Sequence, residues 1–204
     1  MTARSVATGL SHGNRAHAEH AGTAVRQALA RANLERANAV LLFLTPEYAP
    51  NPEPALRAAA RAAGCLQVLG CTGAGILTEQ EWILDSPGAA AMVFGDAVTL
   101  SHPAPGPRYD DEVMLSLCTP SGLTANWLDV PARRIGAISG DLFGHGPFKV
   151  WSGSREAECG HVEAAIQGAD GIITASQGVR ALTSPIEVAD VQGFDVRRLG
   201  NWRG

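Results

Sequence analysis

The stretch AVLLFLTPEYAPNPEPALRAAARAAGCLQVLGCTGAG, Ala39–Gly75, decides the fold class. Ala39–Leu44 is a continuous apolar run of strand length, which is typical of a strand covered on both faces. Residues 52–63 carry alanine and leucine at helical spacing, with a proline at the first position and a glycine after the last, so they predict a helix. Leu66–Leu69 then predicts a short buried strand. A strand, a helix and a strand in this order indicate parallel neighbours in an α/β layer.

The segments on either side extend this pattern. Upstream, Ser5–Leu10 predicts a strand and Arg15–Glu35 predicts a helix whose apolar face consists of small residues. Downstream, Ala89–Phe94 and Val113–Leu117 predict strands with no helix between them, so the sheet is expected to continue antiparallel. The later segments predict a short helix at Leu123–Asp129 and strands at Arg134–Ile138, Phe148–Trp151, His161–Ile166, Gly171–Ala175, Ile186–Asp190 and Phe194–Leu199. The expected fold is α/β, with two helices packed on a mixed sheet that starts parallel and continues antiparallel, and with a β-rich C-terminal half.

Composition narrows the function classes. The chain has 204 residues, 46% of them hydrophobic, which suits one large domain or two small ones with a packed core. Its net charge is -4 and it has no basic stripe, so nucleic acid is not expected as a partner. The sequence has no export signal and no run near the roughly 18–20 apolar residues that cross a bilayer, so we expect a cytoplasmic protein without membrane insertion. Its four cysteines form no C-x-x-C pair, which favours free thiols over a metal site or disulfides.

The turn LGCTGAG, Leu69–Gly75, is the first candidate for a binding site. Its glycines, Gly73 and Gly75 among them, leave backbone N–H groups accessible, and Cys71 and Thr72 add a thiol and a hydroxyl. Such a concave turn can hold a carboxylate or a carbonyl. The alternative is a tightly packed turn without a ligand. The spacing matches neither the dinucleotide fingerprint nor the phosphate loop, so the turn does not indicate nucleotide binding.

A second glycine-rich turn, SGDLFGHG at Ser139–Gly146, supplies groups of both polarities. Ser139, beside Gly140, could donate to a carboxylate, and Asp141 could pair with an ammonium group, as an amino-acid-like ligand requires. The alternative is that Ser139 and Asp141 form a local side-chain-to-backbone turn. Arg180, in SQGVRAL, could clamp a carboxylate with two hydrogen bonds, or it could be a solvated arginine. The first reading requires the two glycine-rich bends to converge on one hollow.

Other side chains raise three further possibilities. Cys71 could be a nucleophile in an enzyme if a histidine or a helix N-terminus activated it. His145 or His161 could be the axial ligand of a haem. His17 and His20 are spaced to face one direction on the first helix, but they lie on its polar side, which favours a solvated face over a metal site.

Four segments of the chain together resemble the FIST family, specifically its N-terminal domain. They are AVLLFLTPEY (Ala39–Tyr48), LQVLGCTGAGIL (Leu66–Leu77), GAISGD (Gly136–Asp141) and ASQGVRALTSPIEV (Ala175–Val188). The resemblance implies a bacterial sensory module that binds a small molecule, an amino acid or similar metabolite, and passes the result to a signalling partner. Some members of the family look like haem-binding nitric oxide sensors, which makes haem a possible cofactor.

The resemblance also implies a second domain after this one. We therefore expect residues 1–204 to form one FIST N-terminal-like sensing domain, belonging to a longer two-domain protein. The expected ligand site comprises Cys71, Thr72, Gly73, Gly75, Ser139, Gly140, Asp141 and Arg180. The expected partners are a small ligand and a downstream domain or protein, and no bond is expected to be made or broken.

Overall fold

A computed structural model describes residues 6–101, 113–169, 184–193 and 195–203 of the chain. The chain divides into two compact units, Met1–Gly171 and Ile172–Gly204, which are described separately. No helix in these described ranges is both long and apolar enough to span a bilayer.

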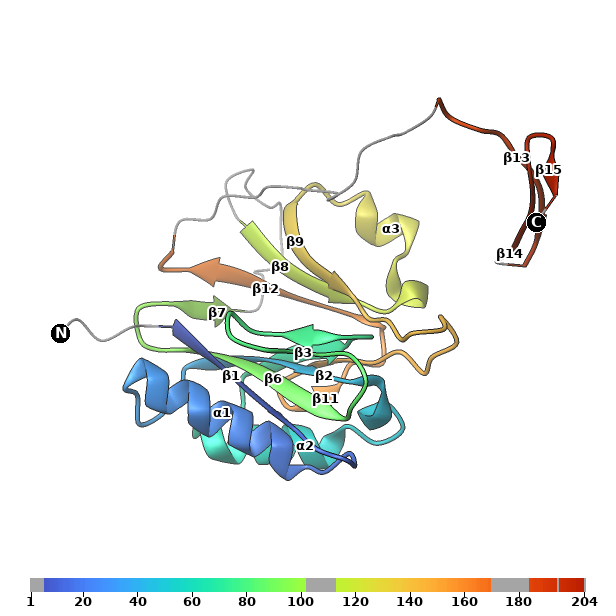
Figure 1. The fold of residues 1–204 in the computed structure, drawn as a ribbon. Coiled ribbons are helices and arrows are strands. Elements are labelled where there is room, and N and C mark those ends of the chain that lie inside the picture. The colour runs from blue at the N-terminus through green and yellow to red at the C-terminus, as the bar shows by residue number, and fades with distance from the viewer. Residues whose placement is uncertain (1–5, 102–112, 170–183, 194, 204) are drawn as a thin grey trace. The chain divides into compact units, whose positions relative to one another are not determined.

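A six-stranded mixed sheet forms the centre of the first unit (Figure 1). Its strands, in spatial order, are β1 (Val6–His12), β6 (Gly88–Phe94), β2 (Ala39–Leu44), β3 (Val68–Thr72), β10 (Val150–Ser152) and β11 (Arg155–Glu156). β2 and β3 are parallel, with Val40 opposite Val68, whereas every other neighbouring pair is antiparallel. The predicted change from parallel to antiparallel pairing is therefore confirmed.

Two helices, α1 (Glu19–Ala32) and α2 (Glu53–Ala63), cover one face of this sheet (Figure 1). Small residues let α1 approach closely, since a Cβ added at Gly9 on β1 would lie 2.1 Å from the carbonyl oxygen of Ala24. The helices end at Asn33 and Gly64, both in the left-handed conformation that allows a helix to stop within one residue.

A second, four-stranded sheet covers the other face. Its strands, in spatial order, are β7 (Thr99–Ser101), β12 (His161–Gln167), β8 (Val113–Cys118) and β9 (Arg133–Ile138). β8 and β9 are parallel, so each sheet contains one parallel pair. Leu41 and Leu69 of the first sheet pack against Leu115 and Ala164 of the second. The first unit thus has three layers, helices, sheet and sheet (Figure 1).

Short elements connect these layers. The 3-10 turns η1 (Pro46–Tyr48) and η2 (Pro120–Gly122) follow β2 and β8, and β4 (Ile76–Leu77) pairs with β5 (Trp82–Ile83). The predicted short helix is confirmed as α3 (Ala125–Leu128).

The second unit contains an antiparallel sheet of three strands, β13 (Val188–Gln192), β14 (Asp195–Leu199) and β15 (Trp202–Arg203). Its apolar side chains are exposed, with Trp202 at 80% and Val191 at 53%. The predicted strand Gly171–Ala175 lies outside the described residues.

The main correction to the expected elements concerns β3. The sequence predicted that this strand ends at Leu69, but it runs on to Thr72, so Gly70 and Cys71 belong to the strand. A Cβ at Gly70 would lie 1.7 Å from the Leu42 carbonyl oxygen and 2.6 Å from Nε1 of Trp151. Gly70 is therefore required by close packing of Trp151, and only residues 73–75 remain for the turn.

Candidate functional site

All four strands of the two parallel pairs end at a buried hydroxyl. Thr72 is the last residue of β3, and Thr45, Thr119 and Ser139 directly follow β2, β8 and β9. Each of these residues is 6% exposed or less. In α/β sheets, ligands bind outside the carboxyl ends of the parallel strands, so these hydroxyls mark the edge where a site is expected.

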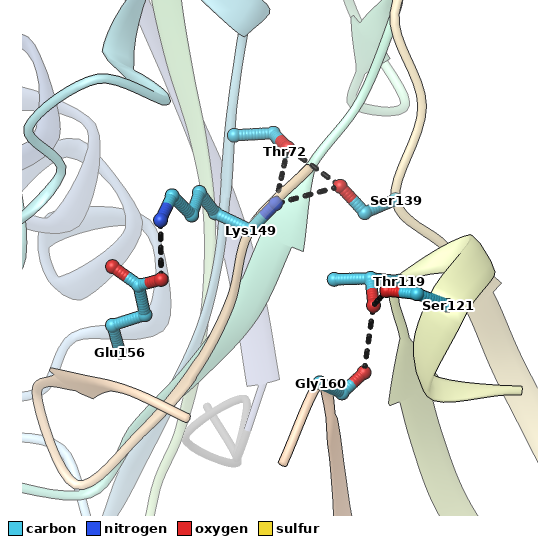
Figure 2. Close-up of polar contacts among 7 residues, drawn as sticks. All are labelled: Thr72, Thr119, Ser121, Ser139, Lys149, Glu156 and Gly160. Atoms are coloured by element: carbon cyan, nitrogen blue, oxygen red, sulfur yellow. Dashed lines mark hydrogen bonds and ion pairs between the residues drawn. The ribbon is translucent and has the colours of Figure 1, made fainter. Parts of the chain in front are cut away.

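Two of these hydroxyls meet across the two sheets. The Oγ1 atom of Thr72 lies 2.6 Å from the Oγ atom of Ser139, and the backbone N–H of Lys149 donates to both oxygens, at 3.3 and 3.2 Å (Figure 2). The amide of Gly140 also donates to the Thr72 carbonyl, at 3.2 Å. The two bends therefore contact each other directly, at the pair Thr72–Ser139.

The Thr72–Ser139 pair has one hydroxyl hydrogen to spare. The two hydroxyls carry two hydrogens, the bond between them uses one, and Lys149 contributes a donor and not an acceptor. Neither oxygen has a further acceptor among the residues that the structure describes. An unpaired buried donor costs about 1–3 kcal/mol, which an incoming ligand oxygen would recover.

The glycines around the pair differ from expectation. The amides of Gly73 and Gly140 were expected to be free, but they donate to the carbonyls of Leu44 and Thr72. The reason is that the strand ends themselves pair across these positions. A Cβ at Gly140 would meet no atom within 4 Å, whereas one at Gly75 would lie 2.4 Å from Cδ2 of Leu84. Open space therefore lies beside Gly140 and not beside Gly75.

The Asp141 carboxylate shapes the second bend. It accepts hydrogen bonds from the amides of Phe143 at 3.0 Å and Gly146 at 2.7 Å, and from that of Gly144. Partial desolvation raises the pKa of Asp141, but these N–H donors outweigh it and lower the pKa below its usual value. Of the two readings left open for Asp141, the local turn is the one that these bonds form.

Cys71 is adjacent to the pair but has the wrong chemistry for a nucleophile. It is 2% exposed and packs with Leu117, Val150 and Val162. Burial, with a smaller contribution from nearby Cys118, raises the pKa of the Cys71 thiol to about 12. Because the thiolate is the reactive form, this residue behaves as a small apolar side chain at neutral pH.

Sequence reasoning missed three residues of this edge, Thr45, Thr119 and Lys149. Thr119 caps the turn after β8, accepting from the Gly122 amide at 3.0 Å and donating to the Gly160 carbonyl at 3.3 Å (Figure 2). One signal was available, because the dipeptide Cys-Thr that ends β3 recurs at 118–119. Lys149 acts through its backbone N–H, while its side chain pairs with Glu156. A backbone contact of this kind cannot be predicted from a sequence motif.

The remaining candidates lie elsewhere. His145 is exposed and stacks on Phe143, with ring centroids 6.3 Å apart, and His161 stacks on Trp127 at 5.2 Å. Arg180 lies outside the described residues. Within the described ranges, no three His, Cys, Asp or Glu side chains form a group that could hold a metal ion.

Comparison with protein-family models places the chain in a family. The family model of the FIST N domain matches residues 38–200, from the residue before β2 to the one after β14. The curated proteins contain no match to the chain. The matched region includes all four strands that end at buried hydroxyls.

Proposed function

The chain belongs to the FIST N domain family, a family of sensory domains, and we propose that it binds an amino acid or small carboxylate at the Thr72–Ser139 pair. The spare hydroxyl hydrogen carries this proposal, because a carboxylate oxygen is the strongest acceptor that a metabolite offers to such a donor. Gly140 leaves room for the ligand to approach, and Gly73 and Gly75 let the neighbouring bend adjust. Cys71 forms an apolar wall beside it.

The proposed output is a change of conformation and not a reaction. The bend 140–146 links β9 to β10, and Asp141 holds its shape through three backbone bonds. A ligand that contacts Ser139 can shift this bend only by its difference in affinity between two states. The proposal retains, from the family resemblance, a cytoplasmic bacterial protein in which a further domain or a partner receives the signal.

A thermal-shift screen of amino acids and small carboxylates tests the function. A ligand at about 100 times its Kd adds roughly 2.7 kcal/mol to the free energy of unfolding, which raises Tm by several degrees. The variant Ser139→Ala removes one hydroxyl of the pair and should lose this shift. Ser116→Ala is the matched control, because Ser116 is also a buried hydroxyl but donates to Glu163 on the second sheet.

A steric variant separates loss of binding from loss of stability. Gly140→Trp adds a large ring beside the pair, at a position where the Cβ itself has no neighbour within 4 Å. It should keep the unliganded Tm and lose the ligand-induced shift, whereas Gly140→Ala should keep both. A full shift in Gly140→Trp, or no shift with any compound in the unaltered protein, contradicts the proposal.

A further inference from the structure

A separate hollow of about 330 Å³ lies beside α2, away from the residues of the proposed site. It is lined by Arg57, Ala60, Arg61, Gly64, Cys65, Leu66 and Ser154. The first four positions are spaced three, one and three residues apart, so they form one stripe along the last turns of the helix. The remaining residues come from the connection to β3 and from the turn between β10 and β11.

The far wall of this hollow is the two-residue turn that joins β10 to β11. Gly153 and Ser154 form this turn with φ of 61° and 65°, the positive values that a two-residue hairpin turn requires at both positions. The Ser154 hydroxyl donates to the Leu66 carbonyl at 2.9 Å, which fixes the turn over the end of the helix.

The lining combines an apolar floor with a cationic rim. Leu66 is 75% exposed, which is a large apolar area to leave in water, and Cys65 is half-buried beside it. Arg57 pairs with Glu53 at 3.0 Å. Arg61 forms no salt bridge with any residue that the structure describes, although its charge, after that of Arg26, helps to lower the pKa of Glu19. A ligand complementary to this surface has an apolar body and one negative charge.

We propose that this hollow is a second binding site, which takes an anionic amphiphile of the medium-chain carboxylate class. The alkyl chain lies on Leu66 and Ala60, and the carboxylate pairs with Arg61. This site shares no residue with the Thr72–Ser139 pair, so evidence against either site leaves the other proposal unaffected.

The position of the hollow makes Arg61 decisive. The C-terminal end of a helix disfavours an anion by about 0.3–1 kcal/mol. Three carbonyls of the last turns of α2, those of Ala60, Arg61 and Ala63, already accept backbone hydrogen bonds, which reduces this effect. The Arg61 guanidinium must supply the attraction that holds the carboxylate, so loss of this group should abolish binding and not merely weaken it.

Cys65 offers a local readout that does not depend on Tm. With octanoate as the probe, the rate at which N-ethylmaleimide modifies Cys65 is followed by mass spectrometry, and exposed Cys159 serves as the internal reference. Octanoate at about ten times its Kd should slow modification of Cys65 by roughly tenfold and leave Cys159 unchanged. Octanamide, which has the same chain without the charge, should protect far less.

Variants complete the test. Arg61→Gln and Leu66→Glu change exposed side chains, so both should fold, and both should abolish protection of Cys65. Arg133→Gln is the matched control, because Arg133 is an exposed arginine on β9 of the other sheet. In this variant, octanoate should protect Cys65 as it does in the unaltered protein. Equal protection by octanamide, protection that survives Arg61→Gln, or no protection in the unaltered protein overturns the proposal.

Discussion

Gly70 shows how a single residue can mislead a reading of the sequence. A glycine after a short apolar run usually marks a turn, yet here it lies inside β3 because Trp151 and the Leu42 carbonyl occupy the space of its side chain. The apolar pattern of the flanking residues contains no information about this contact, since Trp151 lies far along the chain. The start of β3 and the presence of Thr72 at its end were predictable, but the position of the turn was not.

Gly70→Ala should therefore be strongly destabilising. The added Cβ would meet backbone, which cannot move without breaking the pairing of β2 with β3, so we expect a loss of about 3 kcal/mol or more in the free energy of unfolding. Urea denaturation measures it. Gly140→Ala should change stability by less than about 0.5 kcal/mol, because nothing lies within reach there. Similar values for the two variants would contradict the close approach of Trp151.

Cys71 should make the folded protein less stable at high pH. Burial raises its folded pKa from 9.0 to about 12, so the folded state holds the thiol proton where the unfolded state releases it. Stability from this group is complete below pH 9 and falls as pH rises from 9 toward 12. Compared with Cys71→Ala, the unaltered protein should lose roughly 2 kcal/mol more between pH 9 and pH 11. Parallel stability curves for the two proteins would show that Cys71 does not carry the shift.

Among helices and strands, the bounds were predicted best where neighbouring residues in the sequence determine them. β2 has the bounds that its apolar run predicted, and α2 begins within one residue of its predicted start, because the proline and glycine at its ends act locally. α3 is different, since none of its residues is buried. Its attachment to the second sheet depends on Trp127, which stacks on His161 and lies 4.9 Å below the Arg134 guanidinium.

Arg134 should hold α3 in place. Its guanidinium donates to the carbonyls of Trp127 and Val130 and pairs with Glu163 at 2.8 Å, with both charged side chains largely buried. Arg134→Met should cost about 3–5 kcal/mol, because it leaves the Glu163 charge without this partner. Hydrogen exchange should show lost protection first in residues 123–130. Adding Glu163→Gln should recover part of the stability but not the protection of α3, and a recovery of both would contradict this role.

At the scale of the whole molecule, the sequence identified the strands but not the number of sheets. Strands such as β8 and β12 have apolar residues that suit either a longer single sheet or a second one packed on the first. The choice depends on long-range packing of Leu115 and Ala164 against Leu69. The candidate site was predictable to the extent that strand ends carry hydroxyls, but which hydroxyls meet depends on how the two sheets stack.

The Thr72–Ser139 pair should couple the two sheets energetically. In a double-mutant cycle of Thr72→Val and Ser139→Ala, we expect a coupling energy of about 1 kcal/mol, because the bond between the oxygens disappears in either single variant. Denaturant unfolding of the four proteins gives this value. Strict additivity would show that the two hydroxyls do not interact in solution.

Lys149 is the one lysine among 204 residues, and its amide binds both oxygens of this pair. A protease specific for lysine consequently has a single target bond in the chain, before Val150, which is 1% exposed in β10. Cutting requires β10 to detach from β3, so the rate at which two fragments appear measures how often this bond becomes exposed, by local opening or by unfolding. The rate of this cut therefore tests whether a ligand at the proposed site stabilises the edge formed by β3 and β10.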